Sequence, residues 1–409
     1  MVEPVSDVPL FVMRVSSHKL SSPLLFSLLR FAGVLVRLLV LVAVMRPLHP
    51  APPRVVLGPP HTVETVHPVV CAHTRLTDEV EEWKIQRTLS LVREMGAGTI
   101  VEFFPWPYAE SERGTYDWAH FDRIMRHAEN QGLDVIARLG MVPGWARPPA
   151  EEKITNANYL PDEHFETFAQ YVAAFVGRYG DQVDAIIIWN EPNLSGEWGE
   201  RAVDPEAYTW LLRMSYEAAH AVDPDVVVMG GALAPTTDAE AGSLNMSDIE
   251  FLERMYAAEA AGYFDVLAVH TYGHVSAPQD APDPAVTNFR RIELLREIMH
   301  RNGDDDKPVV ITEGGWLDDP RSTIGVRPGQ RITYTLAAFE MVEGWPWAEH
   351  LCIWNFRLPL DLRSRRDAYY ALVSSDFYIK PIYYAIQAFA REWENPYQLW
   401  TIAEPSAAD

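Results

Sequence analysis

The chain alternates regularly between short apolar runs and longer amphipathic stretches, and this alternation constrains its fold more than any other feature. Eight apolar runs occur, at residues 69–72, 99–103, 135–138, 185–189, 226–229, 266–270, 309–312 and 351–354. Helix-patterned stretches follow them, at residues 79–94, 118–131, 162–178, 205–221, 247–261, 289–302, 331–343 and 381–392. Eight such alternations indicate parallel strands, because each return to the same edge of a sheet requires a crossover helix.

The apolar runs also indicate how the strands are covered. Segments such as AIII at 185–188 and VVVM at 226–229 are continuously apolar, which is typical of strands buried on both faces. Eight strand–helix units close a barrel, whereas an open doubly wound sheet usually has fewer and requires a glycine-rich phosphate turn. The sequence contains neither G-x-G-x-x-G nor a Walker motif. We therefore predict an α/β fold, a (β/α)8 TIM barrel, as one domain over residues 65–397.

The charge balance excludes one class of partner. The 409 residues include 57 acidic and 34 basic side chains, which gives a net charge of −23. A strongly negative field repels phosphate backbones, so we expect no nucleic-acid partner.

The two cysteines, Cys71 and Cys352, are too few for a disulfide framework and have no metal-ligand spacing. In the predicted barrel they lie on the first and last strands, which are neighbours. We expect two buried thiols, although this proximity also permits a bond between them.

The N-terminal leader, residues 1–48, contains one apolar run of membrane-spanning length at residues 24–45. Arg30 and Arg37 interrupt this run. Each arginine costs about 2.5–3.5 kcal/mol near the bilayer centre, while each Leu, Val or Phe returns only about 0.3–0.6 kcal/mol, so the insertion energy is close to zero. Basic residues precede the most apolar part, at 38–45, which favours a cytoplasmic N-terminus.

No small-x-small cleavage motif follows this run, so we favour an uncleaved signal anchor and an extracytoplasmic protein, membrane-anchored or else secreted. The alternative is a start assigned too far upstream, a leader that is never made and a cytoplasmic protein. A proline-rich linker is predicted at residues 49–64 and a C-terminal tail at residues 398–409.

Polar residues at the carboxyl ends of the predicted strands are the candidates for function, because barrel active sites lie there. Glu191 and Glu313 directly follow strongly apolar strands, in AIIIWNEPN and VVITEGGW. A buried carboxylate costs several kcal/mol unless it is paired or hydrogen-bonded. The two glutamates form either structural ion pairs, with Arg138 for example, or a carboxylate pair that splits a glycosidic bond. Nearby Asn, His, Tyr and Trp favour the second interpretation.

These residues carry a family resemblance. WNEP at 189–192, followed by ITEGGW at 311–316, resembles glycoside hydrolase clan A. The segment 114–146, HTY at 270–272, IWNFR at 353–357 and SSDFYIKPIYYAI at 374–386 are also similar to that clan. The WNEPN form and the length look most like family 39 and neighbouring single-barrel families.

The resemblance implies a retaining glycosidase that works by double displacement on an oligo- or polysaccharide. Glu191 would be the general acid/base and Glu313 the nucleophile that forms a covalent glycosyl-enzyme. Glu191 must then carry a proton near neutral pH while Glu313 stays ionised. We predict carboxyl groups about 5–5.5 Å apart, the spacing of retaining enzymes.

The resemblance also implies substrate contacts. Asn190 would bind the sugar 2-hydroxyl, Tyr272 would hydrogen-bond Glu313, His270 would line the same floor, and Trp354 would form the platform under the sugar. Many clan members carry an arginine at the end of strand two, where this chain has Glu102, so Arg138 either replaces that arginine or pairs with Glu102. The remaining predicted substrate contacts are His73, Trp145 and Trp316.

The sequence restricts the class of sugar substrate only in part. Family 39 xylosidases usually carry an additional β-sandwich, and this chain has no such segment, which argues for the single-barrel members that act on microbial polysaccharides. The acidic composition favours a neutral or cationic sugar chain. Each aromatic residue of the predicted loops either stacks on sugar rings or packs within its loop. These residues are Trp106, Tyr108, Trp145, Trp198 and Trp316.

Three alternatives stay open. A non-catalytic carbohydrate-binding barrel could retain both glutamates, and a transglycosylase would use the same covalent intermediate. A metal-dependent hydrolase would need His73, His270 and Glu313 as ligands, but three or four converging ligands are not evident. We expect neither a metal nor a cofactor.

Overall fold

The computed structural model describes residues 23–45, 55–149, 156–237, 244–359 and 366–397. The chain divides into two compact units, Met1–Arg54 and Val55–Asp409. In the first unit, helix α1 (Pro23–Met45) coincides with the apolar run predicted as a signal anchor. No helix in the described part of the chain combines the length and the hydropathy needed to cross a membrane. The rest of the leader, residues 49–54 of the linker and the tail at 398–409 lie outside the described residues.

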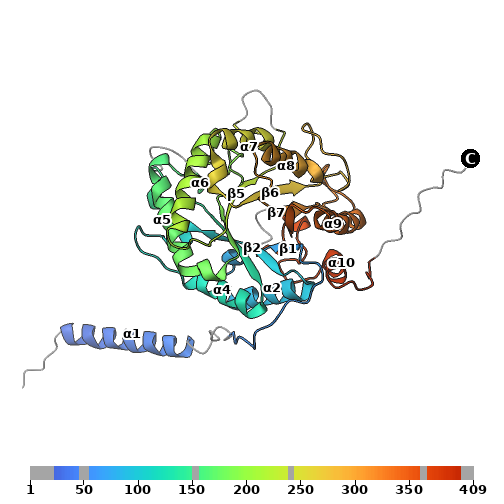
Figure 1. The fold of residues 1–409 in the computed structure, drawn as a ribbon. Coiled ribbons are helices and arrows are strands. Elements are labelled where there is room, and N and C mark those ends of the chain that lie inside the picture. Colours follow the sequence, from blue (N-terminus) through green and yellow to red (C-terminus); the bar gives the residue numbers. More distant parts are fainter. Residues whose placement is uncertain (1–22, 46–54, 150–155, 238–243, 360–365, 398–409) are drawn as a thin grey trace, which may run out of the picture. The chain divides into compact units, whose positions relative to one another are not determined.

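The second unit is a (β/α)8 barrel, as predicted (Figure 1). Eight parallel strands close in sequence order, β1 next to β2 and so on until β8 pairs with β1. The strands are β1 (Val70–His73), β2 (Thr99–Pro105), β3 (Asp134–Gly140), β4 (Ala185–Ile188), β5 (Val228–Leu233), β6 (Val266–Tyr272), β7 (Val309–Gly315) and β8 (Ala348–Ile353).

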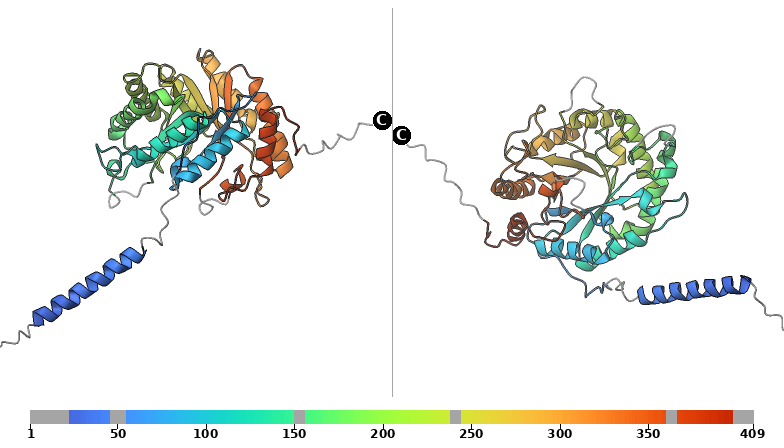
Figure 2. Two further views of the ribbon diagram at one scale, coloured as in Figure 1. Left: turned by 90° about the horizontal axis from the view of Figure 1, so that it is seen from below. Right: turned by 180° about the vertical axis from the view of Figure 1, so that it is seen from behind.

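The helices form a ring around these strands (Figure 2). They are α2 (Glu82–Met95), α4 (Ala119–Gln131), α5 (Phe165–Tyr179), α6 (Pro205–His220), α7 (Asp248–Ala257), α8 (Ile292–Arg301), α9 (Pro328–Glu343), α10 (Pro381–Ala390) and the short α3 (Trp106–Ala109). Short 3-10 helices occur at Leu76–Asp78, Gly144–Ala146, Asp162–His164, Gly180–Gln182, Ala260–Tyr263, Phe289–Arg291 and Asp367–Tyr369. Each predicted strand and helix overlaps an observed one.

The strands are buried on both faces, which explains their continuous apolar runs. Side chains that point into the barrel form one core of their own, and it includes Val101, Ile136, Ile187 and Val310. Side chains of alternate strand residues pack outward against the helices in a second, larger core. The interior is therefore filled, and only the carboxyl ends of the strands can open into a site.

Cys71 and Cys352 form a disulfide bond in this interior core, so the expectation of two free thiols is wrong. The register explains the bond, because β1 and β8 pair these two residues directly, with their Cα atoms 4.1 Å apart. The bond closes a loop between residues 281 positions apart in sequence. On the chain-entropy model a loop of this length stabilises the folded state by roughly 5 kcal/mol.

The described part of the predicted linker packs against the barrel. The His61 backbone N–H donates to the Asn130 carbonyl, and the Asn130 side chain donates to the Gly58 carbonyl. The Gln86 side chain donates to the carbonyl of Val56. Residues 55–64 thus contact α2 and the end of α4.

Candidate active site

A pocket of about 270 Å³ opens at the carboxyl ends of the strands, and both predicted catalytic glutamates line it. Glu191 follows β4, and Glu313 lies near the end of β7. The lining residues are Arg75, Phe103, Arg138, Gly140, Met141, Asn158, Trp189, Asn190, Glu191, Glu197, Glu313 and Trp354. The structure thus brings Arg138, Asn190 and Trp354 together with the two glutamates, as the sequence predicted.

Donors and positive charges surround the carboxylate of Glu313. Its Oε1 accepts a hydrogen bond from Arg138 Nη1 at 2.7 Å, and its Oε2 accepts one from the Tyr272 hydroxyl at 2.8 Å. His73 Nε2 lies 3.3 Å from Oε1. Burial alone would raise the pKa of Glu313, but His270, His73 and Arg138, together with the Tyr272 hydrogen bond, outweigh it and lower this pKa to about 2. Glu313 is therefore ionised at neutral pH.

Glu191 is held by an unusual turn after β4. Glu191 and Trp189 have positive φ angles, 42° and 73°, which are strained for residues other than glycine. The Glu191 backbone N–H donates to the Ala232 carbonyl, and Trp189 Nε1 donates to the Glu197 carbonyl at 2.8 Å. The Glu191 side chain is 18% exposed, against 7% for Glu313. The turn therefore presents the more accessible of the two carboxyl groups.

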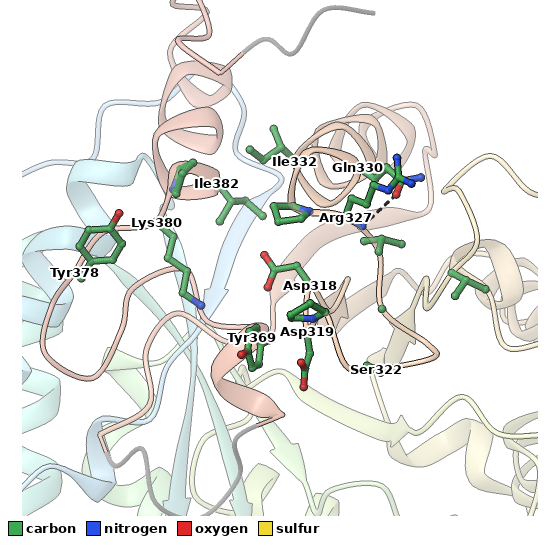
Figure 3. A pocket seen from close by; sticks show the side chains of 16 residues that line it. Asp318, Asp319, Ser322, Arg327, Gln330, Ile332, Tyr369, Tyr378, Lys380 and Ile382 are labelled. Carbon is green, nitrogen blue, oxygen red and sulfur yellow. Dashed lines mark hydrogen bonds between the residues drawn. The ribbon is translucent and has the colours of Figure 1, made fainter. Parts of the chain in front are cut away.

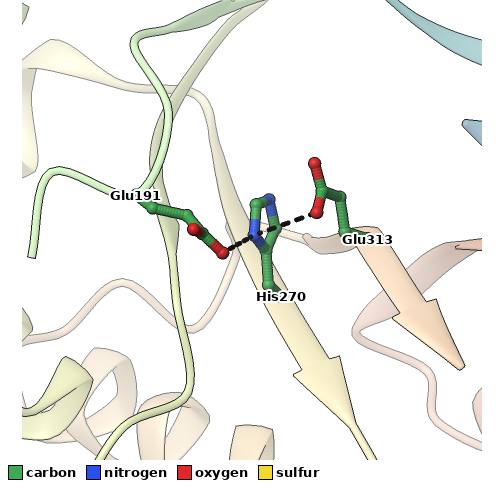
Figure 4. A group of neighbouring side chains, drawn as sticks. All are labelled: Glu191, His270 and Glu313. Atoms are coloured by element: carbon green, nitrogen blue, oxygen red, sulfur yellow. Dashed lines mark hydrogen bonds and ion pairs between the residues drawn. The ribbon is translucent and has the colours of Figure 1, made fainter. Parts of the chain in front are cut away.

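His270 lies between the two glutamates (Figure 4). Its Nδ1 is 2.8 Å from Glu191 Oε1 and 3.7 Å from Glu313 Oε2. Burial lowers the pKa of His270, but the negative charge of Glu313 and the hydrogen bond to Glu191 overcome this and raise it. One oxygen of each carboxyl group and one His270 nitrogen all lie within 4.8 Å of one another.

These three residues fit a metal ion poorly. Both oxygens of Glu313 already accept hydrogen bonds, one from the Arg138 guanidinium. His73, the third ligand of the metal hypothesis, is not among these clustered ligand atoms.

The structure corrects the prediction that Glu102 contacts substrate. Glu102 is fully buried and does not line the pocket. Its carboxylate accepts hydrogen bonds from the backbone N–H groups of Leu76 and Thr77 and from the hydroxyls of Thr74 and Thr77. Burial raises the pKa of Glu102 in spite of these bonds. Glu102 therefore anchors the loop after β1, and Arg138 pairs with Glu313 instead.

Two predicted tryptophans also lie outside the pocket. Trp316 is buried, stacks on Phe289 and donates its Nε1 hydrogen to the Ser276 carbonyl. Trp145 packs edge-on against Trp106 and donates to the Glu110 carbonyl. Both rings are loop packing, and so are the buried rings of Trp106 and Trp198.

The remaining predicted residues differ in their access to the pocket. His73 is fully buried behind Glu313, with its ring edge-on to Trp354, so it contacts the carboxylate from the protein side. Asn190 lines the pocket and accepts a hydrogen bond from Arg138 at 2.7 Å. Tyr108 is the most exposed of the predicted loop aromatics, with 51% of the residue's surface accessible, and it lines a neighbouring hollow.

Sequence reasoning missed a third carboxyl group in the pocket, that of Glu197. Its Oε2 accepts a hydrogen bond from Asn158 Nδ2 at 3.0 Å. Burial and the charge of Glu191 raise the pKa of Glu197 to about 7, although Arg138 and Asn190 act in the opposite direction. The available signal is its position six residues after Glu191, on the loop that follows the same strand.

A larger cavity, of about 890 Å³, lies between the loop after β7 and the start of α9 (Figure 3). Its two carboxylates are committed to ion pairs, Asp318 with Arg331 and Asp319 with Arg321, each at 3.1 Å. The two predicted catalytic glutamates line the smaller pocket and not this cavity.

Fold and site together define a (β/α)8 barrel with a two-glutamate centre at the ends of β4 and β7. No known family model matches the chain. Its fold is similar to that of a family 39 glycoside hydrolase from Bacteroides cellulosilyticus WH2, with a TM-score of 0.64 and 20% identity over 81% of this chain. The chain spans 65% of that protein's length.

Two further solved structures share the fold. A family 39 β-xylosidase from Caulobacter crescentus has a TM-score of 0.58 and 21% identity, over 81% of this chain and 72% of that one. An exo-β-1,4-mannosidase from Opitutaceae bacterium strain TAV5 has a TM-score of 0.54 and 19% identity, over 79% and 59%. The fold is therefore the barrel of these glycoside hydrolases.

Proposed function

We propose that the chain is a retaining glycoside hydrolase that cleaves an oligo- or polysaccharide, with Glu313 as nucleophile and Glu191 as general acid/base. The observation that carries this proposal is the unequal environment of two adjacent carboxyl groups. Glu313 is buried and held ionised by Arg138 and Tyr272, whereas Glu191 is more exposed to the pocket. The shared fold with solved glycosidases supports the same class of reaction.

The reaction proceeds in two displacements. In the first, a Glu313 oxygen attacks the anomeric carbon while the glycosidic oxygen takes the proton of Glu191 and leaves. In the second, Glu191 takes a proton from water, the water oxygen attacks the same carbon, and the Glu313 carboxylate is released. Asn190 and Trp354 line the pocket and would hold the sugar during both steps.

The spacing of the carboxyl groups favours retention of configuration. Inverting enzymes need about 6.5–9.5 Å between the groups to admit a water molecule, and retaining enzymes need about 5–5.5 Å. An oxygen of Glu191 lies within 4.8 Å of one of Glu313. A separation of this size is closer to the spacing of retaining enzymes than to that of inverting enzymes, and it supports the proposal.

The decisive test is chemical rescue. The full chain and its Glu313→Gly and Glu191→Gly variants are assayed on a panel of activated aryl glycosides with and without azide. We expect azide to restore turnover of Glu313→Gly with a glycosyl azide of inverted configuration. Rescue with inversion in Glu191→Gly instead would reverse the two roles. No turnover of any panel member by the wild type, with clear polysaccharide binding, would leave a non-catalytic barrel.

Two alternatives use the same site. A transglycosylase would pass the sugar to an acceptor, and product analysis with acceptor sugars present distinguishes it from a hydrolase. A metal-dependent hydrolase would lose activity on chelation, and we expect activity to persist.

We further propose an extracytoplasmic location with a carbohydrate as the partner. The Cys71–Cys352 disulfide supports this proposal, because such bonds persist in oxidising compartments and are rare in the cytosol. Anchoring through residues 24–45 stays a prediction, as does the absence of a nucleic-acid partner. Fractionation of cells that express the tagged full chain tests the location; recovery in the cytosol would favour the upstream-start alternative.

A further inference from the structure

A second hollow adjoins the catalytic pocket. Its volume is about 680 Å³, and its lining residues are Arg75, Thr77, Asp78, Glu79, Val80, Tyr108, His120, Arg123, Met141, Trp354, Leu358, Pro359 and Asp367. Three of these, Arg75, Met141 and Trp354, also line the pocket that contains Glu191 and Glu313. The two hollows therefore adjoin at these side chains.

We propose that this hollow binds further units of an uncharged sugar chain on the non-reducing side of the cleaved bond, so that the enzyme cuts within chains. The inference rests on the proposed glycosidase function and adds to it the size of the substrate and the mode of attack. An enzyme that removes single terminal sugars needs only the catalytic pocket.

The second hollow lies on the side of the barrel opposite the leaving group. In the closed eight-strand barrel, β4 and β8 lie on opposite sides. Glu191 follows β4, so the leaving group that it protonates departs on that side. The hollow is built by the loops after β1, β2, β3 and β8, and Trp354 at its junction follows β8. It therefore extends away from the leaving group, where the rest of the glycosyl donor must lie.

The two hollows differ in volume. The catalytic pocket, about 270 Å³, is smaller than the roughly 300–1,000 Å³ of a site for a drug-sized ligand, which suits a single sugar ring. The adjoining hollow is more than twice as large. A chain whose reacting unit fills the pocket has room for additional rings beyond Trp354.

The side chains that line the second hollow suit an uncharged sugar. Tyr108 offers a half-exposed aromatic ring, the type of surface on which sugar rings stack. The charged groups are largely paired within the protein: Arg75 donates to Asp78 at 3.0 Å, and Glu79 is bound to the buried Arg357. A wall of paired charges, hydroxyl groups and an aromatic ring matches hydroxyl-rich uncharged sugars better than a polyanion.

The test compares substrates that differ only in length. The full chain is assayed on 4-nitrophenyl β-glycosides of xylose, glucose, mannose and N-acetylglucosamine and of the corresponding disaccharides and trisaccharides. We expect kcat/KM to rise by about tenfold from the monosaccharide to the disaccharide of the accepted sugar, which corresponds to about 1.4 kcal/mol of additional binding in the transition state. Mass spectrometry of the products should show intact oligosaccharides.

Two variants locate the effect. Tyr108→Ala removes the exposed ring, and Val80→Trp fills the hollow from an exposed position; both should lower kcat/KM on the di- and trisaccharides more than on the monosaccharide. Tyr378→Ala is the matched control, because Tyr378 is an exposed tyrosine that lines the separate cavity beside α9. It should change neither value.

The outcomes separate the two proposals. Equal kcat/KM on mono- and disaccharides, or stepwise release of single sugars, would overturn the extended cleft and leave the glycosidase function standing. An advantage of long substrates that survives both Tyr108→Ala and Val80→Trp would also overturn it. No turnover of any panel member would count against the glycosidase function itself.

Discussion

Glu102 and Glu313 are two glutamates in similar places with opposite electrostatics. Each belongs to a barrel strand, β2 or β7, and each is almost completely buried. Glu102 accepts hydrogen bonds only from neutral groups of the loop after β1, and burial raises its pKa. Glu313 contacts a guanidinium and a tyrosine hydroxyl, and its pKa falls to about 2 in spite of burial.

The difference teaches that burial at a strand end does not by itself make a carboxyl group functional. What distinguishes Glu313 is a positively charged partner, Arg138, and an opening shared with Glu191. A charged, accessible carboxylate can attack a substrate, whereas an enclosed one can only hold the protein together. Four substitutions sharpen or break this contrast.

The largest effect is expected for Glu313→Gln. It removes the proposed nucleophile and should lower kcat by about 10⁴-fold or more, because loss of a covalent catalyst has effects of this size. The measurement is the initial rate on the best aryl glycoside, with circular dichroism to show that the variant is folded. A loss of less than tenfold in a folded variant would contradict the assignment.

Arg138→Met should have the next largest effect, about 10²-fold on kcat, because preorganised charge near the reacting group contributes on this scale. In the wild type Glu313 stays ionised down to about pH 2. Without the guanidinium, burial has more influence on its pKa, so the protonated form appears at higher pH. The acid limb of the pH–rate profile should therefore move to higher pH.

The matched control is Arg291→Met, which breaks the buried pair with Asp248 outside the pocket. It should lower stability and leave the acid limb in place. An acid limb that moves equally in both variants would mean that Arg138 acts only on the fold.

Glu197→Gln should act mainly through pH. The pKa of Glu197 is raised from 4.5 to about 7 in the folded protein. Burial and the negative charges of Glu191 and Glu313 raise this pKa, and they outweigh Arg138 and Asn190, which lower it. Its ionisation therefore destabilises the fold, and stability from this group declines as pH rises from about 4.5 to about 7. Glutamine removes that decline, so the Tm of the variant should gain on the wild type between about pH 4.5 and pH 7.

Glu200→Gln, an exposed glutamate of the same loop, is the control and should show no such gain. Parallel Tm curves for Glu197→Gln and the wild type across this range would contradict the raised pKa of Glu197.

Glu102→Gln should have the smallest effect on activity, within about threefold, but should lower the free energy of unfolding by about 1–3 kcal/mol. Its amide group would place N–H donors against the donors of Thr74, Leu76 and Thr77. Urea denaturation measures the loss. If activity fell as far as in Glu313→Gln while stability stayed unchanged, the contrast between the two glutamates would be broken.

The sequence was sufficient to predict the barrel and the position of Glu191 and Glu313 in one pocket. Strands buried on both faces leave continuous apolar runs, and a glutamate directly after such a run stands out. Trp145 and Trp316 were misplaced because ring burial depends on how distant loops pack, as Trp316 on Phe289 shows. Glu197 was missed because the fold of its loop, and not its distance from a strand end, brings it to the pocket. The Cys71–Cys352 bond depends on a strand register that the sequence does not specify.

That disulfide also determines how the molecule responds to force. Because it joins the first and last strands, the segment between Cys71 and Cys352 is a covalent ring. A pull on the two ends of the chain is transmitted through the sulfur bridge, and the segment between the two cysteines bears no load until the bridge is reduced. Reduction under tension would release roughly 900–1,000 Å of hidden contour length. A protease cut inside the ring would likewise leave both fragments tethered.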